Sequence, residues 1–311
     1  MNMKTVYLNN FMSSVVAELE MNGQYGTAHV CGSVLRSVMA FDGEGLPVSG
    51  ITPLWLKAYE GYLLHKGGKG LAWNTVSTYM RMLQAVYNRA VVRKLAAFIP
   101  HQFRDVFTGR KADHRRVLER DDMQKLLLDR EPDITSPGMA WARACLELMF
   151  RFHGMPFVDL AHLRKSDLKD GYLTLRRRKT GMPLSARVDG RAMQLLERYR
   201  NRDDTSPYLL CFLDGNLEGM AAYRDYQRIL RLLNSRLRAL ALWKKVQGKV
   251  TSYSARHTWA TVGRYCHIPI EVISEGLGHA SVTTTEGYMK GFGNSRMDRA
   301  NKVIMNYIFK G

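Results

Sequence analysis

Residues 251–288 read TSYSARHTWATVGRYCHIPIEVISEGLGHASVTTTEGY and hold the most informative pattern in the chain. Helical spacing predicts one helix over residues 255–265 and another over residues 270–277. Arg256 falls in the first helix, and His279 follows the second helix within Leu277-Gly278-His279. Tyr288 lies nine residues beyond His279. The stretch therefore combines a guanidinium, an imidazole and a phenol within one short, mostly helical segment.

These three side-chain types suit the attack of a phenol on a phosphodiester. The transition state gains negative charge on its non-bridging oxygens, and an arginine matches that geometry and stays protonated. Such electrostatic stabilisation is usually a large part of phosphoryl-transfer catalysis. The leaving oxygen needs a proton donor, for which lysine or histidine is suitable. The covalent ester retains the bond energy for religation, so neither ATP nor a metal ion nor another cofactor is chemically required.

The pattern resembles that of the tyrosine site-specific recombinases of the phage-integrase family. Those proteins carry H-x-x-R-H-x-x-A, then L-G-H, then T-x-x-Y with the tyrosine nine residues after the histidine. This chain matches at Arg256-His257, Leu277-Gly278-His279 and Tyr288. The run N-T-V-x-x-Y-M-R-x-L-Q-A-V-Y-N-R-A from Asn74 resembles the last helix of the family's core-binding domain. The resemblance covers nearly the whole chain, and bacterial mobile-element integrases and DNA invertases are the members it is most similar to.

The resemblance implies a role for each matching residue. Tyr288 is the expected nucleophile, which forms a 3′-phosphotyrosine with DNA. Arg256 is the second of two phosphate-clamping arginines, and His279 donates a hydrogen bond to the scissile phosphate. Lys179, in the R-R-K-T-G run, resembles the family's β-hairpin lysine and is the expected general acid. Three arginines at residues 176–178 precede it, so a merely solvated basic turn is the alternative.

Two positions depart from the family's pattern. Tyr253 stands in place of the histidine of H-x-x-R, and a tyrosine can still hydrogen-bond a phosphate oxygen. The first arginine is missing, because Pro156 occupies its usual place. In a subgroup with R-G-M-x-F-x-D the arginine directly precedes the glycine, and that residue is His153 here.

Three interpretations of the missing arginine stay open. His153 is the expected cationic contact, and it would be pH-dependent because the ordinary pKa of histidine is near neutrality. Arg151 could reach the site if its helix has ended, although it lies roughly 200° from His153 around a helix. The site could also simply be altered and less active. Asp159 matches the family's acidic residue, which is expected to orient an arginine.

Charge and cysteine content narrow the class of protein. The chain has 311 residues, with 46 Lys plus Arg against 28 Asp plus Glu, and a net charge of +18. Such a field attracts polyanions, and nucleic acid is the leading partner. Its four cysteines are scattered, with no CxxC pair and no Cys/His cluster, so the sequence predicts neither a zinc site nor a disulfide framework. With no signal-peptide pattern and no apolar run of roughly 18 residues, we expect no membrane association and a cytoplasmic location on the bacterial nucleoid.

The expected fold is mainly α with a small β-hairpin or sheet. Residues 1–103 would form a helical core-binding (SAM-like) domain, 104–117 a basic linker, and 118–311 a mixed α/β catalytic domain with a C-terminal exchange helix. In the first domain, helices are predicted over residues 8–19, 25–41, 53–67 (capped by Thr52) and 74–90 (capped by Asn74). In the second, helices are predicted over residues 119–129, 138–152, 190–201, 223–242 and 295–309, and strands over 171–178 and up to Val188.

The implied function is site-specific DNA recombination by integration, excision or inversion. The expected partners are double-stranded DNA with inverted-repeat recombination sites and three further copies of the chain, as a homotetramer on DNA. A catalytically impaired DNA-binding accessory or regulatory protein of the same fold is the alternative, and a relaxing topoisomerase is a third. The last helix would dock either on a neighbouring subunit or on its own core.

Overall fold

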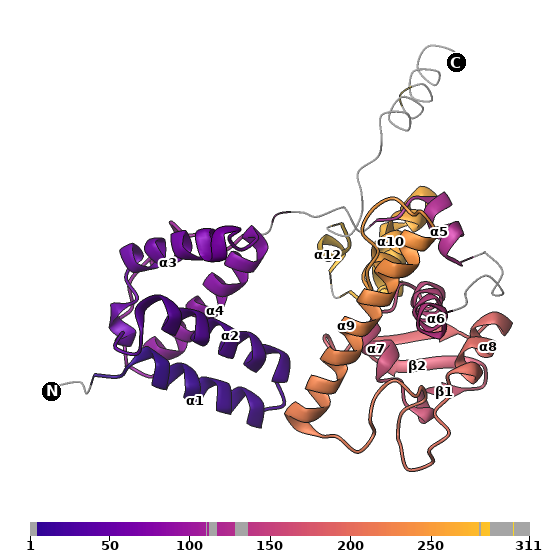
Figure 1. The fold of residues 1–311 in the computed structure, drawn as a ribbon, viewed down its shortest axis with the longest axis horizontal. Helices are drawn as coiled ribbons and strands as arrows, with labels where there is room; N and C mark the ends of the chain where they lie inside the picture. The colour runs from indigo at the N-terminus through magenta and orange to yellow at the C-terminus, as the bar shows by residue number, and fades with distance from the viewer. Residues whose placement is uncertain are drawn as a thin grey trace. The chain divides into compact units, whose positions relative to one another are not determined.

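A computed structural model describes residues 5–109, 111, 117–127, 136–279, 281–286 and 301. The chain divides into two compact units. The first contains Met1–Ala112 with Glu218–Tyr223, and the second contains Asp113–Leu217 with Arg224–Gly311. Helices dominate both units, and a three-stranded sheet lies in the second (Figure 1). The predicted fold class is therefore confirmed, while the predicted helix over residues 295–309 lies outside the described residues.

The first unit packs four α-helices and two short 3-10 helices around one apolar core. Their bounds are α1 (Leu8–Met21), α2 (Tyr25–Asp42), η1 (Val48–Gly50), α3 (Pro53–His65), η2 (Lys66–Gly68) and α4 (Trp73–Val92). Helix α4 contacts α2 and α3, and its buried stripe runs from Val76 to Ala90 at helical spacing. Thr52 caps α3 as predicted, because its Oγ1 accepts a hydrogen bond from Trp55 N at 3.1 Å.

The predicted cap of α4 is wrong. The helix begins at Trp73, with Ala72 as its N-cap residue, so Asn74 already lies inside the first turn. Its side chain forms two hydrogen bonds with the backbone of Lys111. Asn74 Nδ2 donates to Lys111 O, and Lys111 N donates to Asn74 Oδ1, each at 2.8 Å. Ser77 Oγ likewise donates to Gly109 O at 2.6 Å. Hydrogen bonds thus hold the described part of the basic segment after residue 104 against α4, within the first unit.

The second unit combines helices with a small antiparallel sheet in the order β1-β2-β3. The strands are β1 (Leu168–Lys169), β2 (Tyr172–Arg176) and β3 (Pro183–Arg187), and the register pairs Leu173 with both Leu168 and Ala186. The predicted hairpin is confirmed, and β1 adds a strand that the sequence did not indicate. The helices are α5 (Arg120–Leu127), α6 (Pro137–Arg151), α7 (Phe157–Ala161), η4 (Lys165–Asp167), α8 (Gly190–Arg198), α9 (Gly219–Trp243), α10 (Ser254–Tyr265), α11 (Ile270–Gly276) and α12 (Val282–Glu286). The start of α9, up to Tyr223, belongs to the first unit. In the described part of the chain, no helix is long and apolar enough to cross a bilayer.

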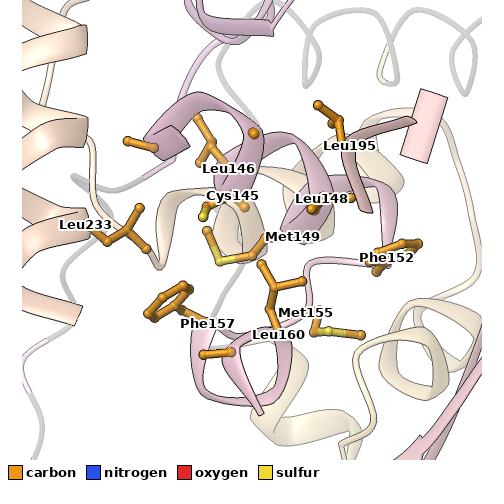
Figure 2. Close-up of a cluster of buried hydrophobic side chains, with 14 of the residues drawn as sticks. Cys145, Leu146, Leu148, Met149, Phe152, Met155, Phe157, Leu160, Leu195 and Leu233 are labelled. Atoms are coloured by element: carbon orange, nitrogen blue, oxygen red, sulfur yellow. The ribbon is translucent and has the colours of Figure 1, made fainter. Parts of the chain in front are cut away.

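The core of the second unit forms around α6 (Figure 2). This helix contacts α7, α8 and α10, and every residue from Ala142 to Met149 is buried. Phe152 and Met155 continue the core beyond the end of α6, and both are fully buried. Because these two anchors flank the turn, the core fixes the path of the backbone at His153 and Gly154.

Candidate active site

Arg256 is a buried arginine in the first turn of α10. Only 2% of it is exposed, so its charge needs partners inside the protein. Nη1 donates to Gly154 O at 3.0 Å, and Nη2 donates to Leu277 O at 2.7 Å. Nη2 also lies 2.7 Å from His279 Nε2. The guanidinium is therefore held between the turn after α6 and the end of α11.

His279 is a neutral imidazole whose tautomer follows from its neighbours. Arginine can only donate, so Nε2 of His279 accepts from Arg256 and the ring proton belongs on Nδ1. Nδ1 lies 2.8 Å from Thr285 Oγ1 in α12, and its N–H can donate to that hydroxyl. Burial, together with the nearby charges of Arg256, Arg177 and Lys179, lowers the pKa of His279 to about 4. The ring is uncharged at neutral pH.

Gly278 lets the end of α11 approach a second buried arginine. Its φ is +61°, in the region that favours glycine. A Cβ at this position would lie 2.6 Å from Cδ of Arg177. Gly278 N donates to Glu275 O at 2.7 Å and His279 N to Ser274 O at 3.0 Å, which closes the helix and aims His279 at Arg256.

Arg177 joins the hairpin to the segment that carries His279. Its Nε donates to Asp159 Oδ2 at 3.1 Å, and the two side chains are only 5% and 1% exposed. Nη1 donates to Leu277 O at 2.7 Å and to Gly278 O at 3.0 Å. The second oxygen of Asp159 accepts from Arg178 N at 2.9 Å. Asp159 thus orients an arginine, as expected, and also fixes the backbone at the start of the hairpin turn.

Lys179 lies at the tip of the turn between β2 and β3, with its side chain exposed. Its charge contributes to the lowered pKa of His279. The turn is closed by Gly181 N donating to Arg177 O at 2.8 Å and Arg177 N donating to Met182 O at 2.9 Å. The turn that carries the exposed Lys179 is thus anchored through Arg177 to the segment that carries His279.

In the described structure, the side chain of His153 makes no hydrogen bond to Arg256, Arg177 or His279. Its ring centroid is 5.6 Å from that of Trp259, and it borders a hollow of about 390 Å³ between β3, α10 and α11. Burial lowers the pKa of His153, so its surroundings favour the neutral ring over the cation that a phosphate contact would need. Arg151 bonds elsewhere: Nε donates to Glu147 at 2.9 Å and Nη1 to Asp189 at 2.6 Å. Among the described residues, neither His153 nor Arg151 hydrogen-bonds to Arg256 or His279.

The two tyrosines singled out from the sequence differ in what the structure describes. Tyr253 directly precedes α10, is 38% exposed, and its ring lies 6.1 Å from that of His257. Tyr288 lies outside the described residues. The described chain leads toward it, since α12 ends at Glu286 and its Thr285 contacts His279.

Two residues that hydrogen-bond into the site of Arg256 and His279 were not identified from the sequence. Thr285 is the threonine of T-x-x-Y, three residues before Tyr288, so the motif itself held that signal. Arg177 is the middle one of three consecutive arginines. The alternation of inward and outward side chains along a strand could have distinguished it from its neighbours. Arg176 and Arg178 are exposed, whereas Arg177 is buried.

Known proteins share this sequence pattern and this fold. The profile of the phage integrase SAM-like domain matches residues 7–104, and that of the phage integrase family matches residues 116–292. Tyrosine recombinase XerA of Pyrococcus furiosus is 29% identical over 140 residues, which are 44% of this chain and 46% of XerA.

Two solved structures resemble the fold. A lambda integrase dimer bound to a COC′ core site has a TM-score of 0.66 at 18% identity, over 93% of this chain and 97% of that chain. A Tn1549 transposon integrase in complex with transposon right end DNA has a TM-score of 0.65 at 16% identity, over 98% of this chain and 100% of that chain. The family profile over residues 116–292 spans more than half of the chain and includes Arg256, His279 and Tyr288. The chain belongs to the phage integrase family, the tyrosine recombinases.

Proposed function

We propose that this chain catalyses site-specific recombination of double-stranded DNA, with Tyr288 as the nucleophile. The observation that carries the proposal is the contact between buried Arg256 and neutral His279, 2.7 Å apart, at the base of the segment that leads to Tyr288. A buried guanidinium stays protonated and presents a fork that fits two oxygens of a phosphate. It is therefore a binding group for the scissile phosphodiester.

The chemistry needs only side chains of this chain and solvent water. The phenol of Tyr288 loses its proton to solvent as its oxygen bonds to phosphorus, the bond from phosphorus to the 5′ oxygen breaks, and Lys179 gives that oxygen a proton. The products are a 3′-phosphotyrosine and a free 5′-hydroxyl. In the second half, the 5′-hydroxyl of a partner strand returns its proton to Lys179 as its oxygen attacks phosphorus, and the tyrosine oxygen leaves and takes a proton from solvent. Arg256 stabilises the negative charge that develops on the non-bridging oxygens in both halves.

His279 can change from acceptor to donor when DNA binds. A phosphate oxygen competes with Nε2 of His279 for the N–H groups of Arg256, because a charged acceptor makes the stronger hydrogen bond. The ring proton then belongs on Nε2, where it can bond the phosphate. The Thr285 hydroxyl allows the exchange, since it can accept from Nδ1–H in one tautomer and donate to bare Nδ1 in the other. Tyr253, ahead of α10, adds a further hydroxyl donor for the same phosphate.

The proposed assembly is a homotetramer on two duplexes with inverted-repeat sites. Support comes from the net charge of +18 and from a similar fold, that of a lambda integrase tetramer bound to a Holliday junction, with a TM-score of 0.59. Exchange of strands between two duplexes requires four cleavage events, so four copies of Tyr288 would act in turn.

Suicide-substrate trapping tests the proposal. A nicked duplex that loses a short fragment after cleavage leaves a protein–DNA adduct, which denaturing electrophoresis detects. The wild type should form the adduct, Tyr288→Phe should not, and Tyr172→Phe, an exposed tyrosine of β2, should form it as the wild type does. DNA binding without any adduct would instead favour an accessory protein. Relaxation of supercoils without strand exchange would favour a topoisomerase.

A further inference from the structure

The site contains a second buried guanidinium whose role the resemblance does not assign. Arg177 and Arg256 both donate to the carbonyl oxygen of Leu277, each at 2.7 Å. Because they share one acceptor atom, the two guanidinium groups are close neighbours. Their exposed fractions are also alike, 5% and 2%. Two cations rarely lie this close inside a protein unless an anion completes the arrangement.

In the described part of the chain, this cluster contains more cations than carboxylates. Arg177, Arg256 and Lys179 are cations, and among the described residues the carboxylate that bonds into the cluster is that of Asp159. Asp159 lies at the Nε edge of Arg177, while the shared carbonyl lies at its Nη1. The neutral His279 adds no compensating charge. A phosphodiester, which becomes more negative in the transition state, would supply the missing anion.

One donor nitrogen of Arg177 makes no hydrogen bond to any described residue. Nε and Nη1 are engaged, whereas Nη2 has no hydrogen-bond partner among the described residues. The ion pair with Asp159 fixes the plane of the guanidinium before any ligand arrives.

We propose that Arg177 is the second phosphate-binding arginine of this active site, in place of the arginine missing near His153. The assignment rests on the proposed function. It is a catalytic role, because Nη2 of Arg177 would bond a non-bridging oxygen of the scissile phosphate beside Arg256. The fork then comes from the end of β2 instead of the end of α6, and Asp159 holds it in position.

The test separates a charge on phosphate from a purely structural role. A cleavable duplex is first selected from a randomised library by covalent capture on the wild-type protein. The same duplex is then made with a neutral methylphosphonate at the scissile position, which removes one negative charge from the reacting group. Cleavage rates are measured at saturating protein on both duplexes, for the wild type, Arg177→Ala, Arg256→Ala and Arg176→Ala. Arg176 is an exposed neighbour that bonds only the turn carbonyl of Gly181 in the described structure, so it is the matched control.

Arg177→Ala should slow cleavage of the phosphodiester by about 100-fold, the usual cost of one oxyanion-stabilising donor. On the methylphosphonate its deficit relative to the wild type should shrink by about tenfold or more, as should that of Arg256→Ala. Arg176→Ala should match the wild type on both duplexes. An equal deficit on both duplexes, or no deficit, would overturn the assignment and leave Arg177 a structural residue.

Two controls keep the outcomes distinct. If circular dichroism shows that Arg177→Ala is unfolded, Arg177→Lys decides, because lysine keeps the charge but loses the fork. Its deficit should again be smaller on the methylphosphonate, and an equal deficit on both duplexes contradicts the assignment. Failure of the wild type to capture any duplex would contradict the proposed function itself, whereas wild-type capture with an unaffected Arg177→Ala contradicts only the assignment of Arg177.

Discussion

Nη2 of Arg256 lies 2.7 Å from Nε2 of His279, and the same nitrogen donates to the carbonyl of Leu277. This contact settles which ring nitrogen carries the proton in the resting site. It also joins α10 to the turn after α11. Binding of a phosphate would have to exchange this contact for its own.

The first prediction concerns the titration of His279. Its pKa of about 4 depends partly on the charge of Lys179, an exposed residue that can be removed without disturbing the core. Lys179→Ala should therefore raise the pKa of His279, whereas Lys169→Ala in β1 should leave it unchanged. Histidine ring NMR signals followed between pH 3.5 and 8 measure the shift. An unchanged pKa in Lys179→Ala would place the hairpin lysine away from the imidazole.

The same pKa sets the sign of a stability effect. The unfolded chain binds a proton at His279 near the ordinary value of 6.5, whereas the folded chain binds it only near 4. Between these values the unfolded state holds more protons, so the free energy of unfolding falls as the pH is lowered through this window. The contribution is fully present above pH 6.5 and is lost toward pH 4.

The second prediction concerns the buried ion pair of Asp159 and Arg177. Asp159→Asn leaves the guanidinium buried without its counter-charge, so the free energy of unfolding should fall by about 3 kcal/mol. Glu18→Gln removes a half-exposed partner of Arg93 in the first unit, and it should cost less than about 1 kcal/mol. Urea unfolding measures both. Equal small losses would mean that solvent reaches the Asp159 pair.

The third prediction concerns the close approach at Gly278. Gly278→Ala combines a left-handed φ with a Cβ 2.6 Å from Arg177 Cδ, so it should destabilise by about 2 kcal/mol or more and abolish DNA cleavage. Gly171→Ala has a similar φ of +76° but open space around its Cβ, and it should cost about 1 kcal/mol and leave cleavage intact. Thermal melts and adduct assays compare the two. Indistinguishable behaviour would contradict the packing of Arg177 on Gly278.

The fourth prediction concerns the leaving group. Lys179→Ala should slow cleavage by about 100-fold or more, because the 5′ oxygen loses its proton donor. A substrate with sulfur at the 5′ bridging position needs no such donor, since a thiolate is a much better leaving group than an alkoxide. Lys179→Ala should then cleave the sulfur substrate as fast as the wild type does. A persistent deficit on that substrate would assign Lys179 a role other than proton donor.

Local sequence signals predicted most of the fold. Thr52 followed by Pro53 marks the start of α3 by itself, since both residues act on the turn that follows them. The cap at Asn74 failed for the opposite reason. Its side chain bonds Lys111, 37 residues away, and no local pattern reveals a partner so distant in the sequence. Strand β1 was not predicted because its two residues are too few to show an alternating pattern.

The part of the site that comes from one short sequence motif could be predicted from the sequence. Arg256, His279 and Thr285 come from one segment, and the structure brings these three together. Arg177 comes from a hairpin about 100 residues earlier, and only the folded chain shows it bonding Leu277 and Gly278. The same holds for His153 in the turn after α6. Its neighbour Trp259 lies on α10, and its pKa is lowered by burial that the sequence does not reveal.

The identity of the residue bonded to DNA is the most direct measurement. The wild-type adduct from a suicide substrate is digested with protease and nuclease, and mass spectrometry locates the residue that retains a nucleotide on its side chain. We expect the nucleotide on the phenolic oxygen of Tyr288, joined through a 3′-phosphate. A nucleotide on any other residue, or no covalent product from a protein that binds and bends the same duplex, would contradict the assignment of Tyr288 as the nucleophile.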